Sequence, residues 1–195
     1  SVMNAKQRER FKERNEADLA YGVPGLGRFR INVFQQRGMV GIVLRLIPLK
    51  IQTARELNLP LVLETMAMEQ RGLILVTGTT GSGKSSTLAA MIDYINSNST
   101  GHILTIEDPI EFLHRDKKCL VNQREIGVDA PSFSEAIRSA LRQDPDVILV
   151  GEMRDFETIQ TALLAAETGH LVMSTRHTLD TTETINRIVS GFPPY

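Results

Sequence analysis

The stretch of sequence that decides the fold is Gly78-Thr79-Thr80-Gly81-Ser82-Gly83-Lys84-Ser85. It matches the phosphate-loop pattern G-x-x-x-x-G-K-[S/T] at every fixed position. Glycines let the backbone curl so that successive N–H groups point at phosphate oxygens, and the helix that follows presents its positive N-terminus to the same anion. Lys84 supplies a full charge to the β- and γ-phosphates, and the hydroxyl of Ser85 suits Mg²⁺. The pattern predicts a site for ATP and Mg²⁺ that extends from Gly78 to Ser86.

The chain after residue 61 alternates short apolar runs with helical patterns. The phosphate loop lies between one such run and a helix, as its chemistry requires. Another helix is expected to open on a capping box formed by Ser132 and Glu135. This alternation predicts an α/β fold with a mostly parallel sheet covered on both faces. The expected strands are 73–77, 103–106, 147–150 and 171–174, and the expected helices are 84–96, 132–142, 155–167 and 181–189.

The first 60 residues have a different texture. Arg and Glu interleave in 4–16, which predicts an exposed helix, and 22–27 is a turn-rich connection. Strands are expected at 28–34 and 41–47. A helix followed by two or three strands indicates a small α+β unit.

The expected boundaries are a partial N-terminal domain over 1–47, a proline-bounded linker over 48–60, and a second domain over 61–195. Because the chain begins at Ser1 inside a helical pattern, we expect a fragment of a longer protein.

Composition excludes some classes of function. The 195 residues carry 22 basic and 23 acidic side chains, and the net charge of −1 argues against a nucleic-acid partner. The single cysteine, Cys119, indicates a reducing compartment and reads as a small buried hydrophobe. No apolar run is long enough to span a bilayer. We therefore expect a cytoplasmic protein without a transmembrane segment.

Acidic side chains follow two of the expected strands. Glu107 and Glu111 come after 103–106, and Glu152 follows 147–150. A phosphate-loop protein that hydrolyses its nucleotide needs carboxylates to hold Mg²⁺ and orient water, and in parallel sheets these lie at the carboxyl ends of strands. Either acid alone would equally suit a helix cap or a solvated surface. Both together, beside an intact phosphate loop, favour a hydrolytic site.

Two further positions near the expected site are less usual. The strand 147–150 ends in Gly151-Glu152, where an aspartate is the common terminal residue. His177 follows the strand 171–174, which places it to sense a γ-phosphate, although a lone histidine is more often a packed polar residue.

With these residues assembled, the sequence resembles the secretion ATPase superfamily, in particular its pilus retraction branch. Four signatures carry the resemblance over nearly the whole chain. They are the phosphate loop, the acidic box 106–111, the Gly-Glu strand end 151–155 and the histidine box 167–178. The resemblance implies a RecA-like ATPase domain, preceded by a PAS-like N-terminal domain that is partial here, and assembly into a homohexameric ring.

The resemblance also implies roles for single residues. Arg30 and Arg45 match arginines that reach the nucleotide phosphates. Either Glu107 or Glu111 would polarise the attacking water, and the choice stays open. Glu152 would act near Mg²⁺, and His177 becomes a site residue. The family usually has leucine where this chain has Arg176, and this arginine would either perturb packing or add a charge near the phosphates.

The function implied is that of an ATP-hydrolysing hexameric motor that drives type IV pilus retraction and twitching motility. Such a motor is cytoplasmic and docks on an inner-membrane pilus platform protein. The alternatives are a pilus extension or type II secretion ATPase, and a regulatory ATP-binding subunit with weak hydrolysis. A small-molecule kinase has less support, because no lid or acceptor pocket is suggested.

Overall fold

The computed structural model describes residues 3, 5–23, 26–48 and 50–192. The chain divides into two compact units, Ser1–Lys50 and Ile51–Tyr195, which we describe separately. The linker predicted over 48–60 stays a prediction, and its part within the second unit contains a turn at 54–58.

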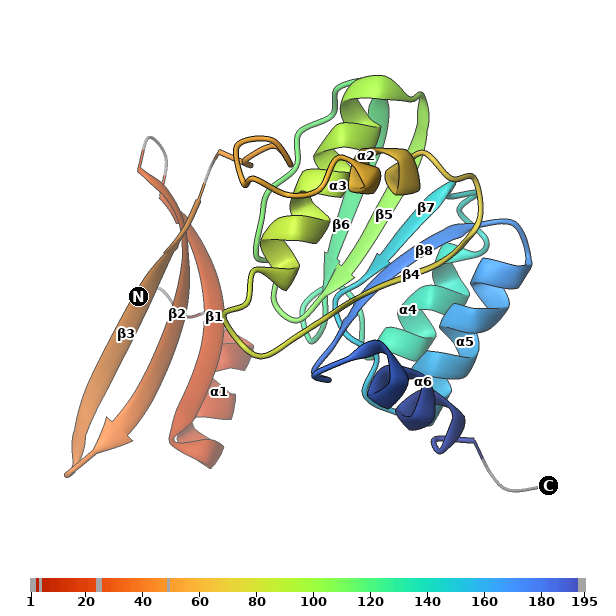
Figure 1. Ribbon diagram of the computed structural model, residues 1–195. Coiled ribbons are helices and arrows are strands. Elements are labelled where there is room, and N and C mark those ends of the chain that lie inside the picture. Colours follow the sequence, from red (N-terminus) through yellow and green to blue (C-terminus); the bar gives the residue numbers. More distant parts are fainter. Residues whose placement is uncertain (1–2, 4, 24–25, 49, 193–195) are drawn as a thin grey trace. The chain divides into compact units, whose positions relative to one another are not determined.

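The first unit is a helix followed by an antiparallel sheet of three strands in the order β1-β2-β3 (Figure 1). The elements are α1 (Ala5–Arg14), β1 (Glu16–Val23), β2 (Gly27–Gln36) and β3 (Met39–Ile47). The expected helix and both expected strands are confirmed. The turn predicted over 22–27 begins later than expected because β1 continues through Val23, and part of it lies outside the described residues.

Alternation along the strands gives this sheet one covered face. Ala17 and Leu19 of β1, together with Ile31 and Val33 of β2, are buried, and Phe11 of α1 packs against them. Residues in between point to the opposite face. Arg30 is therefore on the face that α1 does not cover.

The second unit is a sheet of five parallel strands in the order β4-β8-β7-β5-β6 (Figure 1). This confirms the predicted α/β class. The strands are β4 (Gly72–Thr77), β5 (Gly101–Glu107), β6 (Cys119–Glu125), β7 (Val147–Val150) and β8 (Leu171–Arg176). The helices are α2 (Val62–Ala67), α3 (Lys84–Asn98), α4 (Phe133–Ala140), α5 (Phe156–Glu167) and α6 (Thr181–Val189).

Helices cover both faces of this sheet, as expected. On one face, α3 packs on Ile103, Leu149 and Met173. On the other, α4 and α5 pack on Ile148 and Val172. Neighbouring residues of each central strand thus serve different cores, which is why these strands are apolar throughout. In the part of the chain that the structure describes, no helix has the length and apolarity to cross a bilayer.

Two helices are capped by the residues at which the sequence predicts that they begin. Ser132 caps α4 by accepting a hydrogen bond from the N–H of Glu135 at 3.3 Å. Asp155 caps α5 through the N–H of Thr158 at 2.8 Å. Helix α2 and strands β1 and β6 were not predicted.

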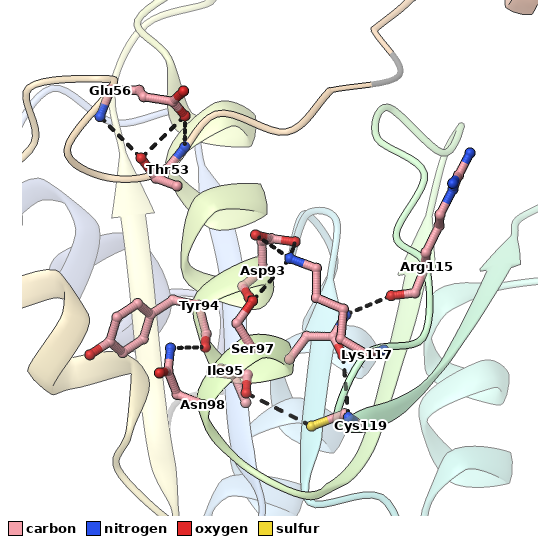
Figure 2. Close-up of polar contacts among 11 residues, drawn as sticks. Thr53, Glu56, Asp93, Tyr94, Ile95, Ser97, Asn98, Arg115, Lys117 and Cys119 are labelled. Carbon is pink, nitrogen blue, oxygen red and sulfur yellow. Dashed lines mark hydrogen bonds and ion pairs between the residues drawn. The ribbon is translucent and has the colours of Figure 1, made fainter.

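The end of α3 is fastened to the loop before β6. Buried Asn96 donates to the carbonyl oxygen of Arg115 at 2.7 Å and accepts from the N–H of Lys117 at 3.1 Å. Figure 2 shows Lys117 reaching back to Asp93 and Ser97 of the same helix, at 2.8 and 2.9 Å. The helix that opens on the phosphate loop therefore also anchors the loop that begins at the acidic box.

Candidate nucleotide site

The predicted phosphate loop joins β4 to α3. Residues 79–83 are exposed, and Lys84, the first residue of α3, is buried. Its ammonium group donates to the carbonyl oxygens of Gly78 at 3.0 Å and Thr79 at 2.7 Å. The lysine is thereby held over the loop, at the positive end of the helix.

The glycines of this loop fit a phosphate cradle. Gly78, Gly81 and Gly83 have φ of +145°, +81° and +93°, a region that other residues rarely adopt. A Cβ on Gly78 would stand 2.6 Å from Oγ of Ser82. The backbone can curl here only because these side chains are missing, which leaves its N–H groups open to an anion.

Strand pairing brings the predicted site residues to one edge of the sheet. Thr77, the residue before the loop, is the register partner of Arg176 at the end of β8. Ile106 of β5 is the partner of Val150 of β7. Because all five strands run parallel, the phosphate loop and Glu152 follow strand ends, and Glu107 ends β5, at the same edge of the sheet.

Glu107 and Glu111 have different environments. Glu107 is buried, and its carboxylate accepts from Thr105 Oγ1 at 2.7 Å, Gln123 Nε2 at 3.2 Å and the N–H of Glu111 at 3.2 Å. Burial raises the pKa of Glu107, although these hydrogen bonds oppose the shift. Glu111 is exposed. The Glu107 carboxylate thus fixes the conformation of the acidic box 106–111, and the Glu111 carboxylate is available to a ligand.

Gly151 explains the unusual end of β7. Its N–H donates to the carbonyl oxygen of Ile106 at 2.8 Å, and a Cβ here would stand 3.3 Å from Cα of Glu107. A side chain would push these two strand ends apart. The glycine therefore lets Glu152 leave the sheet beside Glu107. The Glu152 carboxylate pairs with Nε of Arg154 at 2.7 Å.

The strand between the phosphate loop and Glu152 is β8, and His177 follows its end. His177 is exposed, as a residue open to a ligand must be. His170, at the other end of β8, has a structural role, because its Nδ1 donates to the carbonyl oxygen of Ala165 at 2.9 Å.

The guanidinium of Arg176 contacts the backbone of two other segments. It donates to the backbone carbonyls of Met153 and Arg187, at 2.9 and 3.5 Å. These contacts were not predicted from the sequence, and neither was the one between Gln123 and Glu107.

Arg30 and Arg45 are direct cross-strand partners in β2 and β3. They therefore share one face of the sheet, the face that α1 leaves uncovered. Among the described residues, neither guanidinium has a carboxylate partner within ion-pair distance. Like charges directly opposite destabilise a sheet, so the pair suits an anionic ligand.

The residues present fit Mg²⁺. Across the described ranges, no group of three or more His, Cys, Asp and Glu side chains forms a ready metal cluster. Mg²⁺ does not need one, because it is bound through one or two carboxylates together with substrate phosphates. Ser85, in the first turn of α3, and Glu152 are both partly exposed and would hold the ion.

The chain is similar in sequence to known proteins. The family model described as Type II/IV secretion system protein matches residues 29–190. The type IV pilus retractation ATPase PilT of Pseudomonas aeruginosa is 59% identical over 192 residues, covering 98% of this chain and 56% of that protein. A twitching motility protein of Neisseria gonorrhoeae is 53% identical over 193 residues, covering 99% and 52%.

Solved structures have the same fold. The crystal structure of the pilus retraction motor PilT with bound ADP superposes with a TM-score of 0.96 at 56% identity, covering 98% of this chain and 56% of that one. The Legionella pneumophila ATPase DotB gives 0.90 at 36% identity, covering 99% and 56%. The chain spans about half the length of the curated relatives it matches. These likenesses confirm the expected RecA-like architecture.

Proposed function

Because this chain belongs to the family of type II/IV secretion system proteins, we propose that it binds ATP at residues 78–86 and hydrolyses it to drive type IV pilus retraction. The observation that carries the proposal is that the phosphate loop, Glu107 and Glu152 lie at strand ends on one edge of the parallel sheet, with the exposed Glu111 four residues after Glu107. The bound ADP in the similar PilT structure and the names of the relatives support it.

The chain's own residues divide the work. The N–H groups of residues 78–86 and the ammonium of Lys84 bind the phosphates, and Ser85 and Glu152 hold Mg²⁺, which withdraws charge from the phosphate oxygens when bound. Glu111 polarises the attacking water, because Glu107 is occupied by three hydrogen bonds within the protein. His177 contacts the γ-phosphate.

Arg30 and Arg45 bind the phosphates of the nucleotide. Their support is the unneutralised charge pair across β2 and β3. An anion would relieve this repulsion, and a guanidinium donates to phosphate oxygens in a fixed fork. ATP binding would in this way be linked to the state of the N-terminal sheet.

We also propose a homohexamer that acts in the cytoplasm and docks on a platform protein of the inner membrane. The support is the family resemblance together with the names of the relatives as a pilus retraction ATPase and a twitching motility protein.

Replacing Lys84 by alanine in the organism that makes this protein tests the function directly. We expect cells that accumulate surface pili and lose twitching, because retraction stops while assembly continues. Cells without pili would point to the extension alternative. Unchanged pili and motility would refute a pilus motor. Phosphate release from ATP by the purified protein, compared with the same variant, tests the chemistry separately.

A further inference from the structure

Two consecutive residues of β8 hold the loop that carries Glu152. Thr175 Oγ1 donates to the carbonyl oxygen of Gly151 at 2.6 Å, and Arg176 Nη1 donates to that of Met153 at 2.9 Å. The acceptors are the residues immediately before and after Glu152. Because neighbouring residues of a strand point to opposite faces, the loop is held from both faces of the sheet.

The guanidinium of Arg176 extends further, to α6. Its Nη2 lies 3.5 Å from the carbonyl oxygen of Arg187, in the last turn of that helix. Carbonyls of a last turn lack partners within the helix, and a cation is favoured there. A guanidinium has two terminal nitrogens at a fixed spacing, so Nη1 and Nη2 each serve one of these carbonyls, whereas lysine has a single nitrogen and leucine has no donor. Arg176 thus joins the loop after β7 to α6.

The same helix fixes the segment that follows His177. Thr178 Oγ1 and Thr184 Oγ1 are hydrogen bonded at 2.5 Å. The N–H of Leu179 donates to Oε2 of Glu183 at 2.9 Å. The helix that receives the guanidinium therefore also sets the backbone beside a predicted site residue.

The surroundings of the Arg176 guanidinium indicate that it positions backbone groups rather than forming an ion pair. Burial, and then the neighbouring charge of Arg187, lower the pKa of the Arg176 guanidinium. Arg187 is itself paired with Glu183 at 2.7 Å. Within the described residues, Arg176 has no carboxylate at ion-pair distance. A cation that contacts only backbone carbonyls fixes the positions of those carbonyls.

We propose that Arg176 is a positioning residue, which fixes the turn from Gly151 to Met153 against α6 and so holds the Glu152 carboxylate where Mg²⁺ binds with ATP. Its backbone is the register partner of Thr77, the residue before the phosphate loop. One strand end therefore sets the spacing between the cradle and Glu152. The inference rests on the proposed function.

The test is equilibrium binding of a fluorescent ATP analogue with and without Mg²⁺. We expect Arg176→Leu to reduce the Mg²⁺-dependent gain in affinity about tenfold, as loss of an outer contact to a metal site does, while the Mg²⁺-free affinity stays unchanged. Arg176→Lys should restore only part of the gain. The matched control is Arg142→Leu, which removes a guanidinium contact of 3.1 Å to the carbonyl oxygen of Arg138. This control should keep the full Mg²⁺-dependent gain in affinity.

Each outcome decides the question. A full Mg²⁺ gain in Arg176→Leu would overturn the proposal, and so would an equal loss with and without Mg²⁺, which marks a general role in the fold. If Arg176→Leu does not fold, Arg176→Lys and Thr175→Val are compared in the same way, since each weakens one side of the loop. Failure of the unsubstituted protein to bind the analogue would instead refute the proposed function.

Discussion

The N–H of Glu111 donates a hydrogen bond to the Glu107 carboxylate at 3.2 Å, so one acid of the box holds the backbone of the other. Glu107 is thereby occupied within the protein, and Glu111 is exposed. Two acids that the sequence leaves equivalent acquire separate roles, and substitutions should separate them.

Replacing Glu111 by glutamine should stop hydrolysis without stopping binding. The amide would keep the volume of the side chain but could not accept a proton, and removing a general base typically costs about 10²–10⁴-fold in rate. Phosphate release measures the rate, and a fluorescent ATP analogue measures binding. Turnover at the unsubstituted rate would refute the role of Glu111. The companion Glu107→Gln should instead lower the melting temperature, because three hydrogen bonds meet its carboxylate.

Lys84→Ala should weaken ATP binding at least tenfold. Lys84 is the first residue of α3 and brings a positive charge to the phosphate loop. A hydrogen bond to a charged group contributes about 1.5–3 kcal/mol to the binding free energy. Titration with a fluorescent ATP analogue gives the affinity. Lys118→Ala, which removes an exposed lysine immediately before β6, is the control. Equal affinities of the two variants would contradict a phosphate contact by Lys84.

Arg45→Thr should lower hydrolysis and leave stability unchanged or improved. Removing one of two opposed cations relieves repulsion worth about 0.2–1 kcal/mol, and threonine suits a strand. Urea unfolding and phosphate release are measured on the same preparation. Arg37→Asn takes one charge from the turn beside β3, where φ is +49°, and should keep full activity. A marked loss of stability in Arg45→Thr would show that the arginine serves the fold.

His114 should make stability depend on pH. Its burial is the main reason that its pKa falls from 6.5 to about 4. Between these values the unfolded chain binds a proton that the folded chain does not. The free energy of unfolding should therefore decrease as the pH falls from about 6.5 to 4, by up to about 3 kcal/mol.

Urea unfolding at several pH values measures this effect. His114→Gln should remove the dependence, whereas His177→Gln, at an exposed histidine, should retain it. The same slope in all three proteins would assign the pH dependence to other groups.

The features that could be predicted from the sequence are those that depend on consecutive residues. The strand 147–150 was predicted with its observed bounds because four apolar residues buried on both faces leave little alternative. The phosphate loop was predicted because its chemistry depends on consecutive residues. Strand β6 was missed because it is an edge strand with a polar run, 122–125, that does not read as a buried strand.

The missed details of the site all depend on pairing between distant segments. Gln123 meets Glu107 only because β5 and β6 pair in one register, in which Thr105 is opposite Gln123. The contacts of Arg176 depend in the same way on where β8 enters the sheet. A linear pattern contains no information on such registers.

Because Thr175 and Arg176 contact the residues on either side of Glu152 from opposite faces of the sheet, the number of residues in β8 before them is constrained. Inserting or deleting a single residue between Leu171 and Ser174 would exchange the faces on which Thr175 and Arg176 emerge. The hydrogen bonds from Thr175 to Gly151 and from Arg176 to Met153 would then both be lost, while the strand kept its apolar character. Homologues that vary in length near β8 should therefore vary outside the strand, after Arg176 or before Leu171.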